Sequence, residues 1–305
     1  MLQNKDLAVV ILNWNGKALL EQFLPSVIKY SADAVIYVAD NSSTDDSVAF
    51  VTKQYPTVKI IQNSENGGYA KGYNDALKHV TEPLLCLLNS DIEVTKNWLQ
   101  PIISEFNRDI NTAIIQPKIL DYKNKSYFEY AGAAGGFIDK FGYPYCRGRI
   151  FDTIEEDNNQ YNDTTTIFWA SGACLFIKNS VFKELKGFDE SYFAHVEEID
   201  LCWRAFSKNY KTKYVGTSTI YHVGGATLSN TNPKKTYLNF RNSLFTLVKN
   251  TDSNLVFKIL FRMLLDGVAA IRFLFQLKPL FIVVIFKAHM SFYYNLPHVL
   301  KQRKQ

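Results

Sequence analysis

The first 120 residues alternate short apolar runs with amphipathic segments. Each apolar run has the length of a strand and is followed by polar residues, and the segments between the runs show a helical period. This alternation is typical of an α/β protein with a Rossmann-like, mostly parallel central sheet flanked by helices. The runs are Leu7–Leu12, Ala34–Ala39, Val58–Ile61, Leu84–Leu88 and Ala113–Ile115.

A different pattern begins at residue 127. Residues 127–176 consist of short aromatic and glycine-rich pieces around the polar stretch 152–166, which predicts a meandering β region with a mobile loop. Helical spacing predicts a helix over 196–207. Two short strands are expected after it, near 213–215 and 219–222.

The chain is predicted to be helical from Pro233 to its end. We therefore divide it into an α/β domain, residues 1–250, and a C-terminal amphipathic helical extension, residues 251–305. With 305 residues, 47% of them hydrophobic, the chain is long enough to bury a substantial core. This composition excludes a disordered protein.

The extension has an unusual distribution of polar residues. If residues 254–276 form one helix, their polar side chains fall within about a third of its circumference. The next apolar run, 279–286, is too short to cross a bilayer, which takes roughly 20 apolar residues. Residues 254–287 could lie on a membrane surface or pack against the catalytic domain or a second subunit, and the sequence favours neither. The polar positions are Lys258, Arg262, Asp266, Arg272 and Gln276.

Cysteine usage and the first residues indicate the compartment. The four cysteines form no CxxC pair and have no zinc-like spacing, so we expect them to be reduced and mostly buried. The first apolar run has only the length of a strand, which argues against a secretory signal. We therefore predict a cytoplasmic protein, with a peripheral position on the inner face of the plasma membrane as an option.

The net charge of +5 is modest, and much of the positive excess lies after residue 257. Anionic partners are therefore plausible, with a membrane surface or a phosphorylated ligand ahead of nucleic acid. The absence of an RNP, zinc-finger or arginine-rich motif argues against nucleic-acid binding. The oligomeric state is not indicated.

Polar residues follow the predicted strands, at the edge where open parallel sheets bind ligands. Asp40 opens one of these segments, in which Ser43 and Asp46 fit a helix cap. Asp40 itself lies at a strand end, where a carboxylate can accept hydrogen bonds from a nucleobase or ribose, so we favour a binding role. The segments are Asn13-Trp14-Asn15, Asp40-Asn41, Asn63–Gly68 and Asn89-Ser90-Asp91.

Two further segments suggest a phosphate and a metal site. The glycines of Asn66–Ala76 let a ligand approach the backbone, and the helix start there would present free amides to phosphate, although a simple turn is the alternative. Asp91 follows a buried strand and can hold Mg²⁺ or Mn²⁺ together with a diphosphate. His222 offers a distant second ligand, but a strand-end histidine is more often structural.

The densest group of acids lies in the predicted helix over 196–207. Crowded carboxylates that are partly removed from water have a raised proton affinity, which suits a general base. Helical spacing places Glu198 on the apolar face, while Asp200 is four residues from Arg204 and should pair with it. Glu198 is therefore the expected base, and Glu197 takes that role if the helix starts one residue later.

Taken in order, these motifs resemble those of the inverting nucleotide-sugar glycosyltransferases of family 2, which have the GT-A fold and include rhamnosyltransferases and galactofuranosyltransferases. The resemblance covers roughly residues 5–245, and the joint occurrence of the motifs is far more specific than any one of them. The motifs are a strand-end Asn, Asp-Asn-x-Ser-x-Asp, Asn-x-Gly-aromatic-Ala, Leu-Asn-x-Asp, Ser-Gly-Ala, Gly-Phe-Asp-Glu, an acidic run ending in Asp-Leu, and a late His.

The resemblance implies a role for each group of residues. It implies donor binding, metal binding, contact with the sugar and acceptor, and proton removal. The corresponding residues are Asn13, Asn15, Asp40, Asn66, Lys71, Asn89 and Ser90 for the nucleotide sugar; Asp91 and His222 for the metal; Trp169, Ser171 and Gly172 for the sugar and acceptor; and Glu198, with Glu197 as its competitor, for the base.

Two positions depart from the family pattern. Asn89 replaces the first acid of the DXD motif, which weakens the expectation of tight metal binding without a donor. Glu198 is one methylene longer than the usual Asp, so the two adjacent glutamates are not ranked by the resemblance.

The implied reaction transfers a hexose from a UDP-, dTDP- or GDP-sugar to a hydroxyl of a glycan or lipid-linked acceptor in cell-surface polysaccharide synthesis. The base removes the hydroxyl proton, and Mg²⁺ or Mn²⁺ stabilises the departing diphosphate. A nucleotidyltransferase, or a non-catalytic protein that binds nucleotide sugars as a scaffold, are the alternatives.

Overall fold

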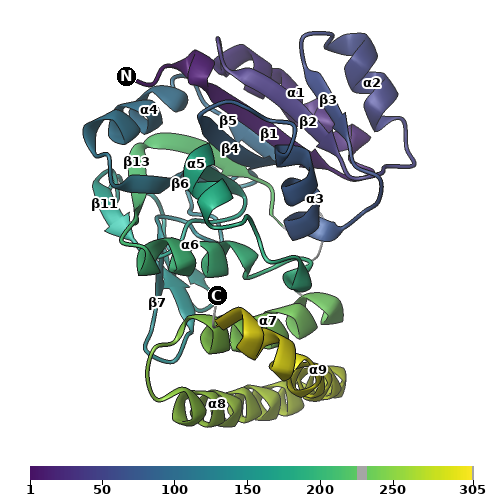
Figure 1. Cartoon of the computed structure of the whole chain (residues 1–305), viewed down its shortest axis with the longest axis vertical. Helices are drawn as coiled ribbons and strands as arrows, with labels where there is room; N and C mark the ends of the chain where they lie inside the picture. The colour runs from purple at the N-terminus through teal and green to yellow at the C-terminus, as the bar shows by residue number, and fades with distance from the viewer. Residues whose placement is uncertain (225–231, 304–305) are drawn as a thin grey trace.

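A computed structural model describes residues 1–224 and 232–303 of the protein. At its centre is a nine-stranded sheet in the order β11-β13-β6-β12-β4-β1-β2-β3, with β5 paired to β13. A separate four-stranded sheet and the C-terminal helices lie below it in the view of Figure 1. The strands of the central sheet are β1 (Leu7–Asn13), β2 (Val35–Asp40), β3 (Lys59–Gln62), β4 (Leu84–Asn89), β5 (Ile92–Val94), β6 (Thr112–Asp121), β11 (Thr164–Ile167), β12 (Cys174–Lys178) and β13 (Lys211–His222).

Strands β4, β1, β2 and β3 pair in parallel. Nearly every residue of β1, β2 and β4 is buried, because alternate side chains enter apolar clusters on both faces of the sheet. Burial on both faces explains why these strands are continuous apolar runs in the sequence. Their register places Asn13 beside Asp40 and Leu12 beside Asn89, so the polar strand ends meet at one edge.

Strand β12 is antiparallel and lies between β4 and β6. It brings the segment before it to the end of β4, where the Asn89 amide donates to the Ala173 carbonyl at 2.9 Å. Strands β6 and β13 pair in parallel. The predicted α/β fold is therefore confirmed, with a parallel half and a mixed half.

The helices follow the predicted spacing. The helix expected over 196–207 is confirmed as α6, and the described part of the region after Pro233 consists of helices joined by short turns. The helices are α1 (Lys17–Tyr30), α2 (Ser47–Gln54), α3 (Gly68–Leu77), α4 (Leu99–Arg108), α5 (Asn179–Glu184), α6 (Glu197–Ser207), α7 (Pro233–Asn250), α8 (Leu255–Phe275) and α9 (Pro279–Arg303).

The predicted β region contains a small antiparallel sheet. Its hairpin loop, residues 139–143, reaches α8, where Phe141 stacks at a tilt on Phe261 with ring centroids 4.4 Å apart. The small sheet thereby links the central sheet to the C-terminal helices (Figure 1). Its strands are β7 (Gly136–Ile138), β8 (Pro144–Cys146), β9 (Arg149–Ile150) and β10 (Thr153–Ile154).

Two local predictions were wrong. The two short strands expected near 213–215 and 219–222 are one strand, β13, whose register against β6 shifts between Val215 and Thr219. Such an irregularity interrupts the pattern in the sequence without ending the strand. The helix after Asp40 begins only at Ser47, so Ser43 does not cap it.

The predicted state of the cysteines is confirmed, because all four are free and buried. Among the described residues, no helix is long and apolar enough to cross a membrane. Helices α7 and α9 pack against each other, and α8 packs against both. The boundary at residue 250 therefore falls between helices that are in contact, and it stays a prediction.

Candidate active site

Asn13 and Asp40 form the polar end of β1 and β2. The Asn13 amide Nδ2 donates to Asp40 Oδ1 at 3.0 Å and to Ser43 Oγ at 3.2 Å, and Asp40 Oδ2 accepts from the Ser43 amide at 2.9 Å. Both side chains are buried, and Asn13 Oδ1 has no protein partner. A buried acceptor without a partner is rare in folded proteins, which fits a position completed by a ligand.

Asn15 holds the next loop in place. Its backbone lies in the left-handed region with φ of 50°, and its Oδ1 accepts from the amides of Thr44 at 2.7 Å and Asp45 at 3.3 Å. The Asn15 amide in turn donates to Ser43 Oγ at 2.8 Å. Ser43, which we expected to cap a helix, instead connects the two strand ends.

Asn66 and Lys71 lie at the start of α3. Asn66 Oδ1 accepts from Asn41 Nδ2 and from the Gly68 amide, both at 3.0 Å. Lys71 pairs with Asp75 at 2.5 Å and Glu65 at 3.4 Å. The side chains of both residues are thus held in place by contacts with other residues of the protein.

The expectation of free amides at the start of α3 was wrong. The Tyr69 amide donates to the Phe193 carbonyl at 2.8 Å, and the Ala70 amide donates to the same oxygen at 3.3 Å. A Cβ on Gly68 would lie 2.4 Å from that oxygen, so only glycine fits there. The start of α3 therefore holds the loop that precedes α6.

Asp91 and His222 meet at the sheet edge, although 131 positions separate them in the sequence, because β5 pairs with the end of β13. His222 Nε2 lies 3.2 Å from Asp91 Oδ1, and both side chains are buried. Asn89 and Ser90 precede Asp91 and are half-buried. Ser90 Oγ and Asn13 Oδ1 both lie next to Gly16. Gly16 thus connects this edge to the polar end of β1.

Glu129 is a third member of this cluster that the sequence did not suggest. Its Oε1 lies 3.5 Å from His222 Nδ1, its Oε2 accepts from the Ala131 amide at 2.6 Å, and it is 5% exposed. Burial opposes the charged form of His222, but Asp91 and Glu129 outweigh it and raise the pKa of His222 to about 10.

The donor set here suits a hard divalent cation. One carboxylate and one imidazole, with Glu129 behind the imidazole, form the usual arrangement of a ligand and its supporting acid. No group of three or more His, Cys, Asp or Glu side chains in the described part of the chain is arranged to hold a metal ion by itself. Asp91 and His222 therefore fit a cation whose remaining ligands are oxygens of a bound phosphate and water, and binding it would displace the proton of His222.

Trp169, Ser171 and Gly172 precede β12, and of the three only Gly172 is not fully buried. Trp169 is buried and donates from Nε1 to the Phe137 carbonyl at 2.7 Å. Ser171 is buried and donates from Oγ to the Ala131 carbonyl at 2.9 Å. Both side chains are buried and hydrogen-bonded to the protein. This is the geometry of residues that shape the wall of a site.

Gly172 lies directly beside the acids of α6. Its carbonyl accepts from Tyr69 Oη at 2.8 Å, and a Cβ built on it would lie 3.8 Å from Glu198 Cδ. The carbonyl of the neighbouring Ala173 accepts from the Asn89 amide. Gly172 and Ala173 therefore connect the sheet edge that carries Asp91 to Glu198.

Glu197 and Glu198 open α6, and each has one carboxylate oxygen, Oε2, that is buried and has no partner. Burial raises the pKa of Glu198 to about 7. Burial and the charge of Glu198 raise the pKa of Glu197 well above its usual range. Glu197 is also the more buried, at 3% exposed. Near neutral pH, Glu198 is therefore the member of the pair that can be ionised.

Asp200 belongs to a different environment. It accepts from Arg204 Nε at 2.8 Å, from Lys249 Nζ at 2.9 Å and from Asn250 Nδ2 at 2.9 Å. Although burial opposes its charge, these partners lower the pKa of Asp200 to about 2. The predicted pairing of Asp200 with Arg204 is confirmed.

The loop before α6 has a strained backbone. Phe193, His195 and Val196 all have φ between 64° and 74°, a region that a β-branched residue such as Val rarely adopts. Strain of this kind persists only where surrounding contacts impose it, and it concentrates at functional sites. It fixes where Glu197 and Glu198 enter the helix.

Asn242 on α7 provides those contacts. Its Nδ2 lies 3.1, 3.0 and 2.7 Å from the carbonyl oxygens of Tyr192, Ala194 and His195. Arg241 donates to the carbonyls of Ser191 and Tyr192. The sequence analysis did not identify Asn242, and its only signal is a polar residue on the buried face of an amphipathic helix.

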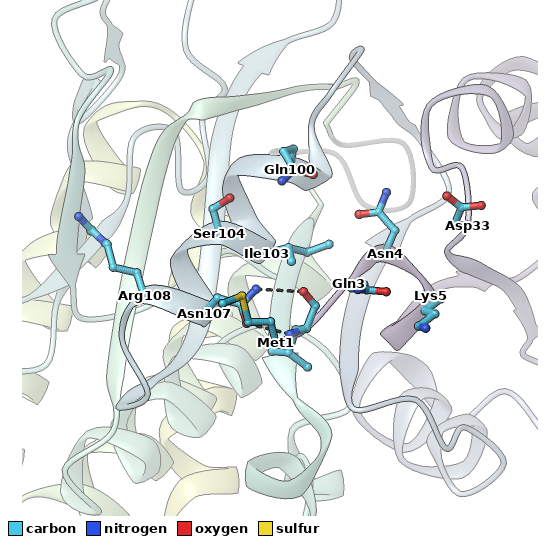
Figure 2. A pocket seen from close by; sticks show the side chains of 11 residues that line it. Met1, Gln3, Asn4, Lys5, Asp33, Gln100, Ile103, Ser104, Asn107 and Arg108 are labelled. Atoms are coloured by element: carbon cyan, nitrogen blue, oxygen red, sulfur yellow. Dashed lines mark hydrogen bonds between the residues drawn. The ribbon is translucent and has the colours of Figure 1, made fainter.

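A cavity of about 800 Å³ lies elsewhere, between the N-terminal segment and α4 (Figure 2). Asn107 exchanges two hydrogen bonds there with the backbone of Leu2, at 2.8 and 2.9 Å. The cavity is at the amino end of β1, whereas the residues described above are at the carboxyl end. It contains none of the predicted site residues.

Comparison with known proteins identifies the family of the chain. A family model for glycosyl transferase family 2 matches residues 8–186. The N-acetylglucosaminyl-diphospho-decaprenol L-rhamnosyltransferase of Mycobacterium tuberculosis is 24% identical over 232 residues, which are 71% of this chain and 75% of that protein. The low-salt glycan biosynthesis hexosyltransferase Agl10 of Haloferax volcanii is 25% identical over 209 residues, 67% of this chain and 62% of that protein.

Solved structures show the same fold. The mannosyltransferase PcManGT from Pyrobaculum calidifontis, in complex with GDP-Man and Mn²⁺, has a TM-score of 0.58 at 11% identity, over 95% of this chain and 87% of that one. GalNAc-T7 with UDP, GalNAc and Mn²⁺ has a TM-score of 0.61 at 17% identity, over 80% of this chain and 47% of that one. This chain thus spans about half the length of the GalNAc-T7 chain. Because the family model matches more than half of the chain, the protein belongs to glycosyl transferase family 2 and is a glycosyltransferase with the GT-A fold.

Proposed function

We propose that this enzyme transfers a sugar from a nucleotide-diphosphate sugar to a hydroxyl of a glycan or lipid-linked acceptor, with inversion at the anomeric carbon, in cell-surface polysaccharide synthesis. The observation that carries the proposal is Glu198, a half-buried carboxylate with a pKa of about 7, whose Oε2 has no protein partner and which lies beside Gly172. A general base works best when its pKa is near the working pH.

In the proposed reaction, Glu198 accepts the proton of the acceptor hydroxyl as its oxygen attacks the anomeric carbon. The bond between that carbon and the diphosphate breaks in the same step, and a single displacement inverts the configuration. Glu197 stays protonated, because its pKa is raised further and Glu198 is next to it. This difference favours Glu198 over Glu197 as the base.

The donor would lie along the carboxyl ends of the parallel strands. Asn13, Asn15 and Asp40 suit the nucleoside, and Asn66, Lys71, Asn89 and Ser90 surround the path of the diphosphate. Asp91 and His222 would hold Mg²⁺ or Mn²⁺, which neutralises charge on a leaving diphosphate. Trp169 and Ser171 would shape the wall of the sugar pocket, and Gly172 would face the acceptor.

Several known relatives support the choice of substrates. PcManGT and GalNAc-T7 were solved with nucleotides and Mn²⁺, and the mycobacterial rhamnosyltransferase is named for a lipid-linked acceptor. We therefore propose a UDP-, dTDP- or GDP-hexose donor. The cytoplasmic location and the inner membrane face are part of the same proposal, as is the division into a catalytic unit, 1–250, and an extension, 251–305. No observation favours a nucleotidyltransferase or a scaffold.

The test is a transfer assay with a panel of nucleotide sugars and Mn²⁺, followed by NMR of the product anomer. We expect inversion. Glu198→Gln should lower kcat by about 10³-fold, because Gln keeps the shape but accepts no proton. Glu197→Gln is the matched control and should lose less than about tenfold. A retained anomeric configuration, or full turnover in Glu198→Gln, would contradict the proposal.

A further inference from the structure

Helix α8 buries charged residues and exposes large apolar ones. Its buried residues are Arg262 and Asp266, which are only 4% and 1% exposed. Arg262 Nε donates to Asp266 Oδ1 at 3.1 Å, and Arg262 Nη1 donates to the Gly142 carbonyl at 3.0 Å. Asp266 also contacts His289 Nε2 at 3.0 Å and accepts from Tyr143 Oη at 3.2 Å. The middle of the polar stripe seen in the sequence, Arg262 and Asp266, therefore faces the protein, whereas Arg272 and Gln276 at its end are exposed.

The outer face of α8 is apolar along its whole length. Its large apolar side chains recur every three or four residues, and each is between 54% and 83% exposed. Their spacing is that of one continuous helix face. These residues, which we call the α8 outer face, are Val256, Leu260, Leu264, Val268, Ile271 and Phe275.

Helix α9 extends this surface. It packs beside α8, and both helices lie at the edge of the molecule farthest from β1 to β3 (Figure 1). Large apolar side chains on α9 and in the turn between the helices are also exposed, from 44% to 89%. Isolated exposed apolar residues are ordinary, but a patch over two helices indicates an interaction surface. These side chains are Leu277, Leu280, Val283, Phe286, Met290 and Tyr293.

The charges around the patch are mostly positive, and the exposed acid Asp152 lies at its edge, paired with Arg272. In residues 255–303 the only acid is Asp266, which is buried and paired with Arg262. Exposed lysines lie beside the apolar surface, with Lys278 in the turn between the helices, Lys287 next to Phe286, and Lys301 near the end of α9. An apolar face with a basic margin complements an anionic bilayer surface.

We propose that the outer surface of α8 and α9 inserts into the interfacial layer of an anionic phospholipid membrane. Because no helix in the described residues can span a bilayer, the pair would lie in the plane of the membrane. A second copy of this chain is a poorer occupant, since a symmetric contact would place lysines of like charge against one another. The inference concerns this surface alone, so its failure would leave the proposed transfer reaction standing.

Vesicle sedimentation of the full chain tests the proposal. We expect binding to vesicles of phosphatidylcholine with phosphatidylglycerol, and much weaker binding to phosphatidylcholine alone. The triple variant Leu260→Ser, Leu264→Ser and Val268→Ser should lower the partition coefficient by about a hundredfold, because three side chains lose their transfer into lipid. The control is Phe206→Ser on α6, which removes a side chain of similar exposure, 60%, outside this surface and should bind like wild type.

The basic margin makes a separate contribution. The double variant Lys278→Gln and Lys287→Gln should weaken binding to the anionic vesicles by about thirtyfold, since each lysine near such a surface contributes about 1 kcal/mol. It should leave binding to phosphatidylcholine unchanged. Equal loss on both kinds of vesicle would overturn the assignment of an anionic surface.

Insertion depth gives a readout that does not depend on affinity. Tryptophan fluorescence of Leu264→Trp should be quenched by brominated lipids more than that of Phe206→Trp, measured against the four native tryptophans in wild type. Equal quenching in the two variants would contradict insertion. A solution dimer that the triple variant dissociates, with no vesicle binding by wild type, would assign the surface to a second copy and overturn the proposal.

Discussion

Helix α6 carries acids on two sides, only a few residues apart. The surroundings on the two sides shift the pKa values of these acids in opposite directions. On the side of Gly172, each of Glu197 and Glu198 has a buried carboxylate oxygen and no cationic partner among the described residues, and their pKa values are raised. On the side of α7, Asp200 is also buried, but Arg204 and Lys249 lower its pKa to about 2. The difference teaches that burial alone does not make a base. A base needs burial without a compensating charge.

Removing Asp200 should have the largest effect on stability. Asp200→Ala leaves the side chains of Arg204 and Lys249 without their carboxylate, so the free energy of unfolding should fall by about 3–5 kcal/mol. In Glu198→Gln, measured above pH 7 by the same denaturant titration, stability should be unchanged or higher, because a buried unpaired charge is removed. Equal losses in both variants would erase the contrast between the two sides.

The contributions of Asp200 and Glu198 to folding stability depend on pH with opposite signs. The pKa of Asp200 is lower in the folded protein, so its contribution is present above about pH 4 and is lost as the pH falls towards 2. The pKa of Glu198 is higher in the folded protein, so ionising it costs stability as the pH rises from its ordinary value of 4.5 to about 7. In denaturant titrations against pH, Asp200→Ala should therefore be less stable than wild type above about pH 4, and Glu198→Gln should be as stable or more stable above about pH 7, with both differences shrinking towards low pH.

The support that α7 gives to the strained loop should matter for activity more than for stability. Asn242→Leu keeps the volume but removes the donor shared by the carbonyls of Tyr192, Ala194 and His195. Glu198 would then shift relative to the acceptor, and kcat should fall by about a hundredfold with little change in KM for the donor.

Asn295→Leu is the matched control, because the Asn295 amide donates only to Ser291 within its own helix. It should keep kcat within about twofold of wild type. A loss in kcat of the same size in both variants would show that the helices, and not the loop contacts, determine the effect.

Elements with a strong period were predictable from the sequence. The apolar runs became β1 to β4 because both faces of those strands are covered, and α6 appeared where its spacing placed it. The pairing of Asp200 with Arg204 followed from helical geometry alone. The order of motifs in the sequence also led us to group Asp91 with His222. Strands β5 and β13 bring these two residues to one edge of the sheet.

What depends on tertiary contacts was not predictable. Glu129 reaches His222 only because the segment after β6 folds back along the end of β6, which pairs with the end of β13, and no motif marks it. The left-handed backbone at Val196 contradicts the preference of that residue and is imposed by α7. In α8 the polar stripe was visible in the sequence, but the direction it faces was not. These features arise where the surroundings override local preference.

The pH dependence of transfer separates the two glutamates of the Gly172 side. The rate should fall about tenfold for each pH unit below about 7, because Glu198 must be deprotonated to accept the hydroxyl proton. In Glu197→Gln the midpoint should stay near 7, since Glu197 is already neutral there. Single-turnover rates over a pH series measure both. A midpoint that disappears in Glu197→Gln would make Glu197 the base.

The smallest expected effect concerns a buried acid whose neighbour is a histidine. Glu129 lies 3.5 Å from His222 Nδ1, on the side of the ring opposite Asp91, where it can fix the orientation of the imidazole. Glu129→Gln should therefore weaken Mn²⁺ binding by about tenfold in the presence of a nucleoside diphosphate. Electron paramagnetic resonance of free Mn²⁺ measures this without any transfer reaction.

Glu93→Gln on β5 is the control for that measurement, because Glu93 pairs with Lys125 and lies one residue from Ile92, the partner of His222 in the sheet. It removes an acid from the same edge without touching the imidazole, so any general loss of negative charge would appear in both variants. If both weaken Mn²⁺ equally, the effect is long-range electrostatics. If only Glu129→Gln does, a buried acid can also act through orientation, a third role beside the proposed base Glu198 and the paired Asp200.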